Sequence, residues 1–218
     1  PTALGRLRAA RPGLRLLLRE DLTDPLLAAL AGGALDLVAM ALPFDVPAEF
    51  HVEPLFEDGY SLATPRGHPL AARVAAGGAD LEARHLLLLE KGHCLQRHAL
   101  SSFPGVRLDQ DESFAATSLP TLVAMVEQGL GLTLLPDLAV EAGVARGFDV
   151  ALTALPEARP RRIVLVWRRT SALGGLYRSV ARALVEAREG LRAEDAPPGP
   201  DGAEAARAGE GGAPPPPV

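Results

Sequence analysis

One stretch of the sequence brings several reactive side chains close together. Cys94 is the only cysteine, and two histidines, one lysine and one arginine lie within four residues of it. Nearby positive charge favours the thiolate, which is the form that attacks peroxides and disulfides. The pattern therefore indicates a redox-active thiol. The alternative is that Cys94 is a small, inert apolar side chain in the core.

The elements expected around Cys94 would support this chemistry. The apolar run Leu86–Leu89 predicts a short buried strand, Gly92 predicts a turn, and the residues after Cys94 have roughly helical spacing. We therefore expect a helix that begins close to Cys94. The unpaired N–H groups and the positive end of the dipole of such a helix would stabilise the thiolate further.

The rest of the chain shows a sequence of helical and extended patterns. Helices are expected over residues 4–10, 24–32, 118–128, 136–140 and 173–189. Strands are expected over residues 14–19, 35–41, 51–56, 60–64, 114–117, 130–135, 150–155 and 162–167. Residues 71–79 read as a loop, and either Thr23 or Asp24 is expected to cap the second helix, as Ser118 caps a later one. The helix–strand alternation at the start predicts a parallel sheet covered by helices.

Composition sets limits on the class of protein. The 218 residues are 48% hydrophobic, which suits one or two domains with a substantial core. The net charge of −5 and the lack of a basic block indicate no nucleic-acid-binding surface. A single cysteine excludes an intrachain disulfide, and the histidines lack metal-ligand spacing, so we expect no metal. No apolar run is long enough to span a membrane.

The two ends of the chain also carry information. The sequence begins at Pro1 without a methionine, so we expect that the start of the gene is missing. Residues 193–218 hold seven of the 20 prolines and no aromatic residue. Such a segment has too little apolar surface to offset the entropy of ordering. We therefore predict a disordered tail over residues 191–218.

Longer motifs resemble a known family. The segment Ser118-Leu-Pro-Thr-Leu-Val-Ala-Met-Val-Glu-Gln-Gly-Leu-Gly-Leu-Thr-Leu-Leu-Pro136 is similar to a signature of LysR-type transcriptional regulators in their effector-binding domain. The opening, with Arg11-Pro-Gly-Leu-Arg-Leu16 and Gly33-Ala-Leu-Asp-Leu-Val38, fits the same domain. Within that family, Glu90-Lys-Gly-His-Cys-Leu95 followed by Phe114-Ala-Ala-Thr-Ser-Leu119 resembles the OxyR group of hydrogen-peroxide sensors.

The resemblance implies a fold and an assembly. The expected fold is α/β, with two Rossmann-like lobes joined by two crossover strands, as in periplasmic binding proteins. Lobe I would comprise residues 1–60 and 169–190 without its usual first strand, and lobe II residues 61–168. The resemblance further implies a cytoplasmic homodimer or tetramer that uses no cofactor. Such a protein binds DNA only through a helix-turn-helix domain that is absent from this chain.

The resemblance also implies a site. In the OxyR group the peroxidatic cysteine follows Gly-His, which matches Cys94, and the expected pocket around it comprises Thr23, Gly92, His93, Ser113 and Arg168. Two of the matched positions depart from the family. The resolving cysteine is replaced by Phe103, and a pocket histidine is replaced by Ser113. The first departure rules out an intramolecular disulfide switch.

Several functions fit these observations. The leading hypothesis is the regulatory domain of an OxyR-like regulator that senses peroxide through one cysteine and is not an enzyme. The second is a LysR-type domain that binds a small organic effector between its lobes, with an inert Cys94. A transporter solute-binding protein shares the expected fold but would need an export signal upstream. A thiol peroxidase would need a resolving partner, which this chain does not encode.

Overall fold

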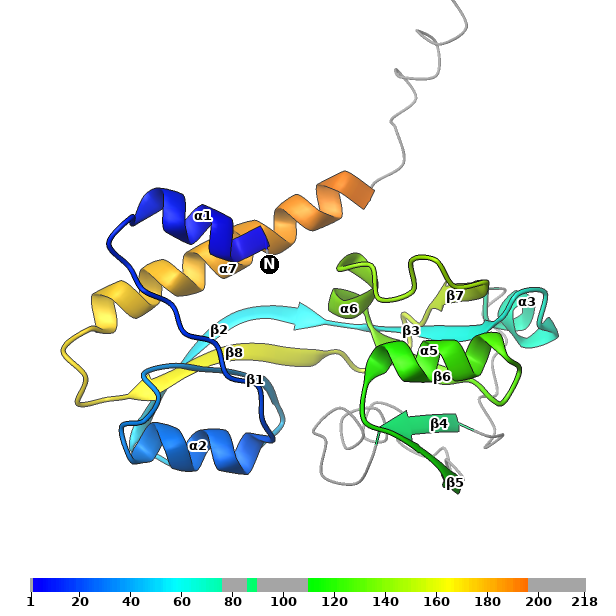
Figure 1. The fold of residues 1–218 in the computed structure, drawn as a ribbon, viewed down its shortest axis with the longest axis horizontal. Coiled ribbons are helices and arrows are strands. Elements are labelled where there is room, and N and C mark those ends of the chain that lie inside the picture. Colours follow the sequence, from blue (N-terminus) through cyan, green and yellow to red (C-terminus); the bar gives the residue numbers. More distant parts are fainter. Residues whose placement is uncertain (1, 76–85, 90–109, 196–218) are drawn as a thin grey trace, which may run out of the picture.

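Two long strands connect the two halves of the molecule. The computed structural model describes residues 2–75, 86–89 and 110–195. Strand β2 (Phe50–Asp58) leaves the first half and continues through Gly59 into β3 (Tyr60–Pro65) of the second, and β8 (Arg161–Arg168) brings the chain back (Figure 1). The expected arrangement of two α/β lobes joined by two crossovers is confirmed.

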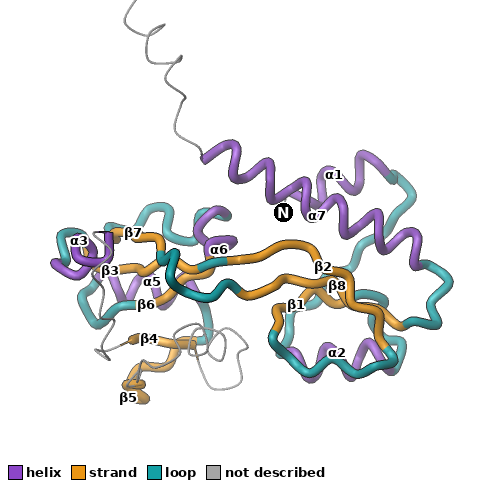
Figure 2. Tube along the Cα trace, turned by 180° about the vertical axis from the view of Figure 1, so that it is seen from behind, coloured by secondary structure: helices purple, strands orange, loops and turns teal. Residues whose placement is uncertain are grey.

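The first lobe is a sheet between two helical layers. Its strand order is β1-β8-β2, with β1 at Val38–Leu42. Helix α2 (Thr23–Ala31) covers one face, while α1 (Thr2–Ala10) and α7 (Gly174–Asp195) lie side by side on the other (Figures 1 and 2). Alternation along β8 explains both layers, because Val164 and Val166 pack toward α2 while Leu165 and Trp167 pack toward α7.

The second lobe contains two sets of paired strands. Strands β6 (Thr133–Pro136) and β7 (Val150–Ala154) flank β3, and β4 (Leu86–Leu89) pairs in parallel with β5 (Gln110–Ala116). The amide of Leu87 donates to the Leu132 carbonyl at 2.8 Å and so links the two sets. Helices α3 (Pro69–Ala75), α5 (Leu119–Glu127) and α6 (Asp137–Glu141) complete the lobe. Alternate leucines of β4 pack into two different cores, one of which contains Val74 of α3 and the other the apolar face of α5.

The pairing corrects two predictions about the first lobe. The predicted parallel sheet is wrong there, because β8 runs antiparallel to both β1 and β2; the parallel pair lies in the second lobe. Residues 14–19 were predicted as a strand but pair with no described strand. Leu17 and Leu18 in that segment are 86% and 76% exposed. An apolar run becomes a strand only where a neighbour offers its backbone N–H and C=O groups.

Other boundaries also differ from the sequence-based expectations. Residues 71–75 belong to helix α3 and not to a loop. Helix α7 continues to Asp195, so the first residues of the predicted tail are helical, while the remainder, residues 196–218, lie outside the described residues. Because β8 is the central strand of the first sheet, we propose that residues 161–168 belong with lobe I instead of lobe II. None of the helices in the described segments has both the length and the apolar character to cross a bilayer.

Candidate sensing cleft and hinge

The carboxyl ends of the parallel strands β4 and β5 meet at one edge of the second lobe. Leu89 ends β4 and Ala116 ends β5, and both are buried in the core beneath α5. Ser118 follows directly and caps α5, as predicted, since its Oγ accepts a hydrogen bond from the Thr121 amide at 3.3 Å. The crevice outside the carboxyl ends of parallel strands is where α/β folds usually bind ligands.

A cavity of about 590 Å³ occupies this edge. Leu89, Thr117 and Ser118 line it from the strand ends, and the turn after α6 lines it through Gly143 and neighbours. Glu20 of the first lobe also lines it, so the cavity lies between the lobes. Its volume falls in the range of small-molecule pockets.

Thr23 lies close in sequence to the first-lobe wall of this cleft. It is the first residue of α2 and is only 8% exposed. The predicted capping function of Thr23 or Asp24 is wrong, because the N-cap position is Leu22 and no side chain caps the helix. The Thr23 hydroxyl makes no hydrogen bond within the described part of the chain, so it is free to contact a ligand.

Arg168 is placed elsewhere by its contacts. Arg168 ends β8 at the position paired with Phe50. Arg161 begins β8 at the point where the two lobes join, which we call the hinge, and at ~3.3 Å per residue it lies ~23 Å from Arg168. The Arg168 guanidinium donates to the carbonyl of Leu30, in the last turn of α2, and to that of Leu35, just beyond the helix. These contacts hold Arg168 at the opposite end of α2 from Thr23, about 10 Å along the axis at ~1.5 Å per residue. The structure thus does not bring Arg168 and Thr23 together.

The side chains of the remaining predicted site residues are not among the described parts of the chain. Gly92, His93, Cys94 and Phe103 lie outside the described residues, as does the helix predicted near Cys94. Ser113 lies within β5, where only the backbone is described. Cys94 follows Leu89, a residue of the cleft wall, by five positions in the sequence.

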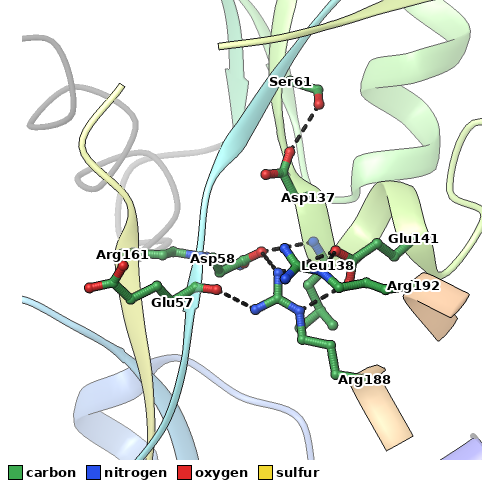
Figure 3. A network of polar contacts seen from close by, with 9 residues as sticks. All are labelled: Glu57, Asp58, Ser61, Asp137, Leu138, Glu141, Arg161, Arg188 and Arg192. Atoms are coloured by element: carbon green, nitrogen blue, oxygen red, sulfur yellow. Dashed lines mark hydrogen bonds and ion pairs between the residues drawn. The ribbon is translucent and has the colours of Figure 1, made fainter. Parts of the chain in front are cut away.

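A network of charged groups surrounds the point where the lobes join (Figure 3). At its centre is Asp58, the last residue of β2, whose side chain is 0% exposed. Arg161 of β8 donates two hydrogen bonds to Asp58 Oδ2, at 2.9 and 2.8 Å. The Leu138 amide of α6 donates to Asp58 Oδ1 at 2.8 Å. A single buried carboxylate therefore ties both crossover strands to the second lobe.

Helix α7 joins the same network through two arginines. Arg188, 4% exposed, donates to the Glu57 carbonyl and lies 3.4 Å from Asp58 Oδ1. It also donates to Glu141 of α6 at 3.1 Å, and Arg192 donates to the same carboxylate at 2.7 Å (Figure 3). The first-lobe helix α7 is in this way linked to α6 of the second lobe.

Two carboxyl groups of α6 titrate away from their ordinary values. Burial raises the pKa of Asp137 above 3.8, opposed by a hydrogen bond from Ser61 and reinforced by the charges of Asp58 and Glu141. Burial also acts to raise the pKa of Glu141, but the hydrogen bonds from Arg188 and Arg192 outweigh it and leave the pKa lowered.

Sequence reasoning missed this hinge network. Asp58 and Arg188 are 130 positions apart, and neither stands out in its own segment. The only local signal is the spacing of Arg188 and Arg192, which puts both on one face of a helix.

Comparison with known proteins assigns the family. The LysR substrate-binding domain model matches residues 1–189. The chain belongs to the LysR substrate-binding domain family. OxyR of Escherichia coli K12, named as a DNA-binding transcriptional dual regulator, is 40% identical over 184 residues, which cover 84% of this chain and 60% of the relative. This LysR-type domain thus spans 60% of the length of that relative.

Solved structures agree with the assignment. A variant of the OxyR2 regulatory domain from Vibrio vulnificus has a TM-score of 0.74 at 33% identity, covering 84% of this chain and 88% of that one. A cysteine-to-serine mutant of OxyR from Corynebacterium glutamicum with hydrogen peroxide bound has a TM-score of 0.72 at 29% identity, covering 96% and 64%. The LysR-type domain therefore shares its fold with OxyR regulatory domains.

Proposed function

We propose that this domain is the regulatory part of an OxyR-like transcription regulator that senses hydrogen peroxide through Cys94. The observation that carries the proposal is the cleft between the lobes. Leu89 lines this cleft and lies five residues before the only cysteine. The domain is 40% identical to a regulator named OxyR. The peroxide bound by the Corynebacterium relative supports the same chemistry.

The reaction needs only the thiolate and peroxide. The Cys94 sulfur attacks one peroxide oxygen, an S–O bond forms, and the O–O bond breaks. The leaving hydroxide takes up a proton and becomes water, and the cysteine becomes a sulfenic acid. These 218 residues contain no second cysteine and have Phe103 where the OxyR group has its resolving thiol. The sulfenic acid therefore persists or forms a mixed disulfide with an outside thiol.

The pocket proposed around Cys94 draws on both lobes. Thr23 offers from the first lobe a hydroxyl that is unpaired among the described residues. In the second lobe, Ser113 lies within β5 and Thr117 directly follows this strand. Arg168 is proposed to act differently, as a structural clamp on the end of α2, because its guanidinium is already held by two carbonyls.

Mass spectrometry of the chain after brief exposure to low peroxide, with dimedone present, tests the sensing function. We expect one dimedone adduct, on Cys94, which is lost in Cys94→Ser and slowed in Thr23→Val. Asp24→Asn, one position along the same helix, is the matched control and should react like the unmodified chain. Cys94 that remains unmodified at peroxide concentrations sufficient for OxyR of Escherichia coli would contradict the proposal.

A second function is favoured by the size of the cleft. A volume of about 590 Å³ exceeds what a peroxide molecule needs and suits an organic effector. If the domain binds an organic effector, a thermal-shift screen with small organic acids should raise the melting temperature of Cys94→Ser as much as that of the unmodified chain. A screen without hits, together with peroxide-dependent labelling of Cys94, would leave peroxide sensing as the function.

A further inference from the structure

A separate cavity lies at the end of the first lobe remote from the hinge, where β8 leads into α7. Its volume is about 360 Å³, and its walls include His51 of β2, Trp167 of β8 and Gly174 at the start of α7. Neither Thr23 nor any residue of the interlobe cleft lines it. We call it the α7 pocket.

Trp167 presents an unpaired donor to the α7 pocket. The side chain is only 3% exposed, with its ring packed against His51 at 4.3 Å and Tyr177 at 5.5 Å between centroids. Its indole N–H has no hydrogen-bond partner among the described residues and is not one of the fully buried polar atoms, so it can reach a ligand in the pocket. A Cβ placed on Gly174 would lie 3.9 Å from this nitrogen, so the N–H borders the space above the glycine.

Positive groups converge on the same space. The Arg178 Nη1 atom would also lie 3.9 Å from a Cβ on Gly174, and Arg178 makes no hydrogen bond or ion pair with the described residues. Arg169 lines the pocket too and uses only its Nε–H, which donates to the Ala48 carbonyl at 2.9 Å. Gly174 and Gly175 open a 22-residue helix, whose first N–H groups have no partner within the helix.

The lining of the pocket carries positive charge without a negative group to balance it. No carboxylate is among its lining residues, and the carboxylate of Glu53 is already hydrogen-bonded to the His51 ring at 3.0 Å. Two guanidinium groups, an indole N–H and a helix start form a site suited to oxygen atoms carrying negative charge.

We propose that the α7 pocket binds a small dicarboxylate. One carboxylate would accept from Arg178 and the Trp167 indole above Gly174, and the second would reach Arg169. A planar guanidinium matches a carboxylate with two parallel hydrogen bonds, and the aromatic wall suits a short carbon chain between the two acid groups. The volume is that of a small-molecule pocket. This ligand site is independent of Cys94 and of the peroxide reaction.

Trp167 is the only tryptophan, so its fluorescence reports directly on the pocket. Titration of the chain with succinate, at an ionic strength held constant with chloride, should give a saturable change in Trp167 emission. Arg178→Gln removes a charged hydrogen-bond donor and should raise the half-saturating concentration about tenfold or more. Arg182→Gln removes the same charge one turn along α7, outside the pocket, and should leave the titration unchanged.

A second variant tests whether Arg178→Gln weakens binding only through the change in charge. Gly174→Ala places a methyl group in the space shared by the two donors without a steric clash, because both lie 3.9 Å away. It should weaken succinate binding while preserving or raising the melting temperature. The proposal is overturned if emission does not saturate, if Arg178→Gln and Arg182→Gln behave alike, or if sulfate saturates the signal at lower concentrations than succinate.

Discussion

At the scale of single residues, the hinge depends on a close fit between Gly59 and Asp137. Gly59 joins β2 to β3, and a Cβ at this position would come within 2.5 Å of Asp137 Oδ2. The other oxygen of Asp137 accepts a hydrogen bond from Ser61 at 2.9 Å. A methyl group on residue 59 would therefore push this carboxylate away from its only described donor.

Replacement of Gly59 by alanine should therefore destabilise the domain. Loss of the Ser61 hydrogen bond from a half-buried carboxylate predicts a decrease of about 1–2 kcal/mol in the free energy of unfolding. Urea denaturation followed by circular dichroism measures it. Gly5→Ala, where an added Cβ meets nothing within 4 Å, is the matched control and should not destabilise. Equal stability of the two variants would show that Asp137 adjusts freely.

The raised pKa of Asp137 predicts a dependence of stability on pH. The folded chain holds this proton more tightly than the unfolded chain, so the contribution favours folding below the ordinary value of 3.8 and is lost as pH rises through the raised pKa. Asp137→Asn keeps an acceptor for Ser61 and removes the buried charge. It should raise the melting temperature at pH 7 and have a diminishing effect toward pH 3. The exposed Asp45→Asn should change neither, and a lower melting temperature of Asp137→Asn at pH 7 would contradict the sign.

At the scale of elements, α7 is fixed to the hinge unequally by its two arginines. Arg188 is 4% exposed and contacts a fully buried Asp58, whereas the Arg192 side chain is 58% exposed. Removing one partner from a buried ion pair costs about 3–5 kcal/mol, while an exposed pair contributes ~0–1 kcal/mol. Arg188→Met should therefore be far more destabilising than Arg192→Met in chemical denaturation.

A further substitution separates charge from packing in this result. Arg188 also lies over the Phe56 ring, with its guanidinium carbon 4.3 Å from the centroid. Arg188→Met alone leaves the buried Asp58 carboxylate without one of its two arginine partners. Adding Asp58→Asn removes the negative charge of that carboxylate. The double variant should recover part of the lost stability. No recovery would mean that Arg188 acts mainly through its packing.

The sequence predicts where some elements begin and end, but not which strands pair with each other. Leu86–Leu89 and the Ser118 cap were predicted correctly because a run of leucines and a capping serine carry their signal within a few residues. Strand partners carry no such signal, so the sequence did not predict the central position of β8 or that residues 14–19 pair with none of the described strands. The same limit applies to sites, since Asp58 and Arg188 meet only after both lobes have folded.

At the scale of the whole molecule, the described residues connect the lobes through two crossover strands and a network of charged groups beside them. Strands β2 and β8 cross between them, and the Asp58 network fastens α7 to α6 beside the crossing (Figures 1 and 3). The proposed sensing cysteine lies in the sequence between β4 and β5, which are both strands of the second lobe. Any rearrangement after oxidation that alters the lobe angle would therefore act against the contacts of Arg188 with Glu141 and Asp58.

The exposed leucines of the first lobe predict self-association. Leu17 and Leu18 are adjacent and 86% and 76% exposed, and Leu22 nearby is 39% exposed. Leucines that are exposed together are typical of a surface that another chain covers. The expected homodimer would bury roughly 1,200–2,000 Å² in total, and each leucine buried within it contributes ~1.5–3 kcal/mol.

Sedimentation velocity over a micromolar concentration series tests this assembly. We expect a dimer for the unmodified chain and at least about a tenfold weaker association for Leu17→Ser with Leu18→Ser, from the loss of two apolar contacts. Leu130→Ser with Leu173→Ser removes two leucines that are 45% and 50% exposed on other parts of the surface, and should leave the dimer intact. If the control pair dissociates the dimer and the Leu17 and Leu18 pair does not, the interface lies on a different face. A monomer at all concentrations would mean that this surface does not bind a second copy.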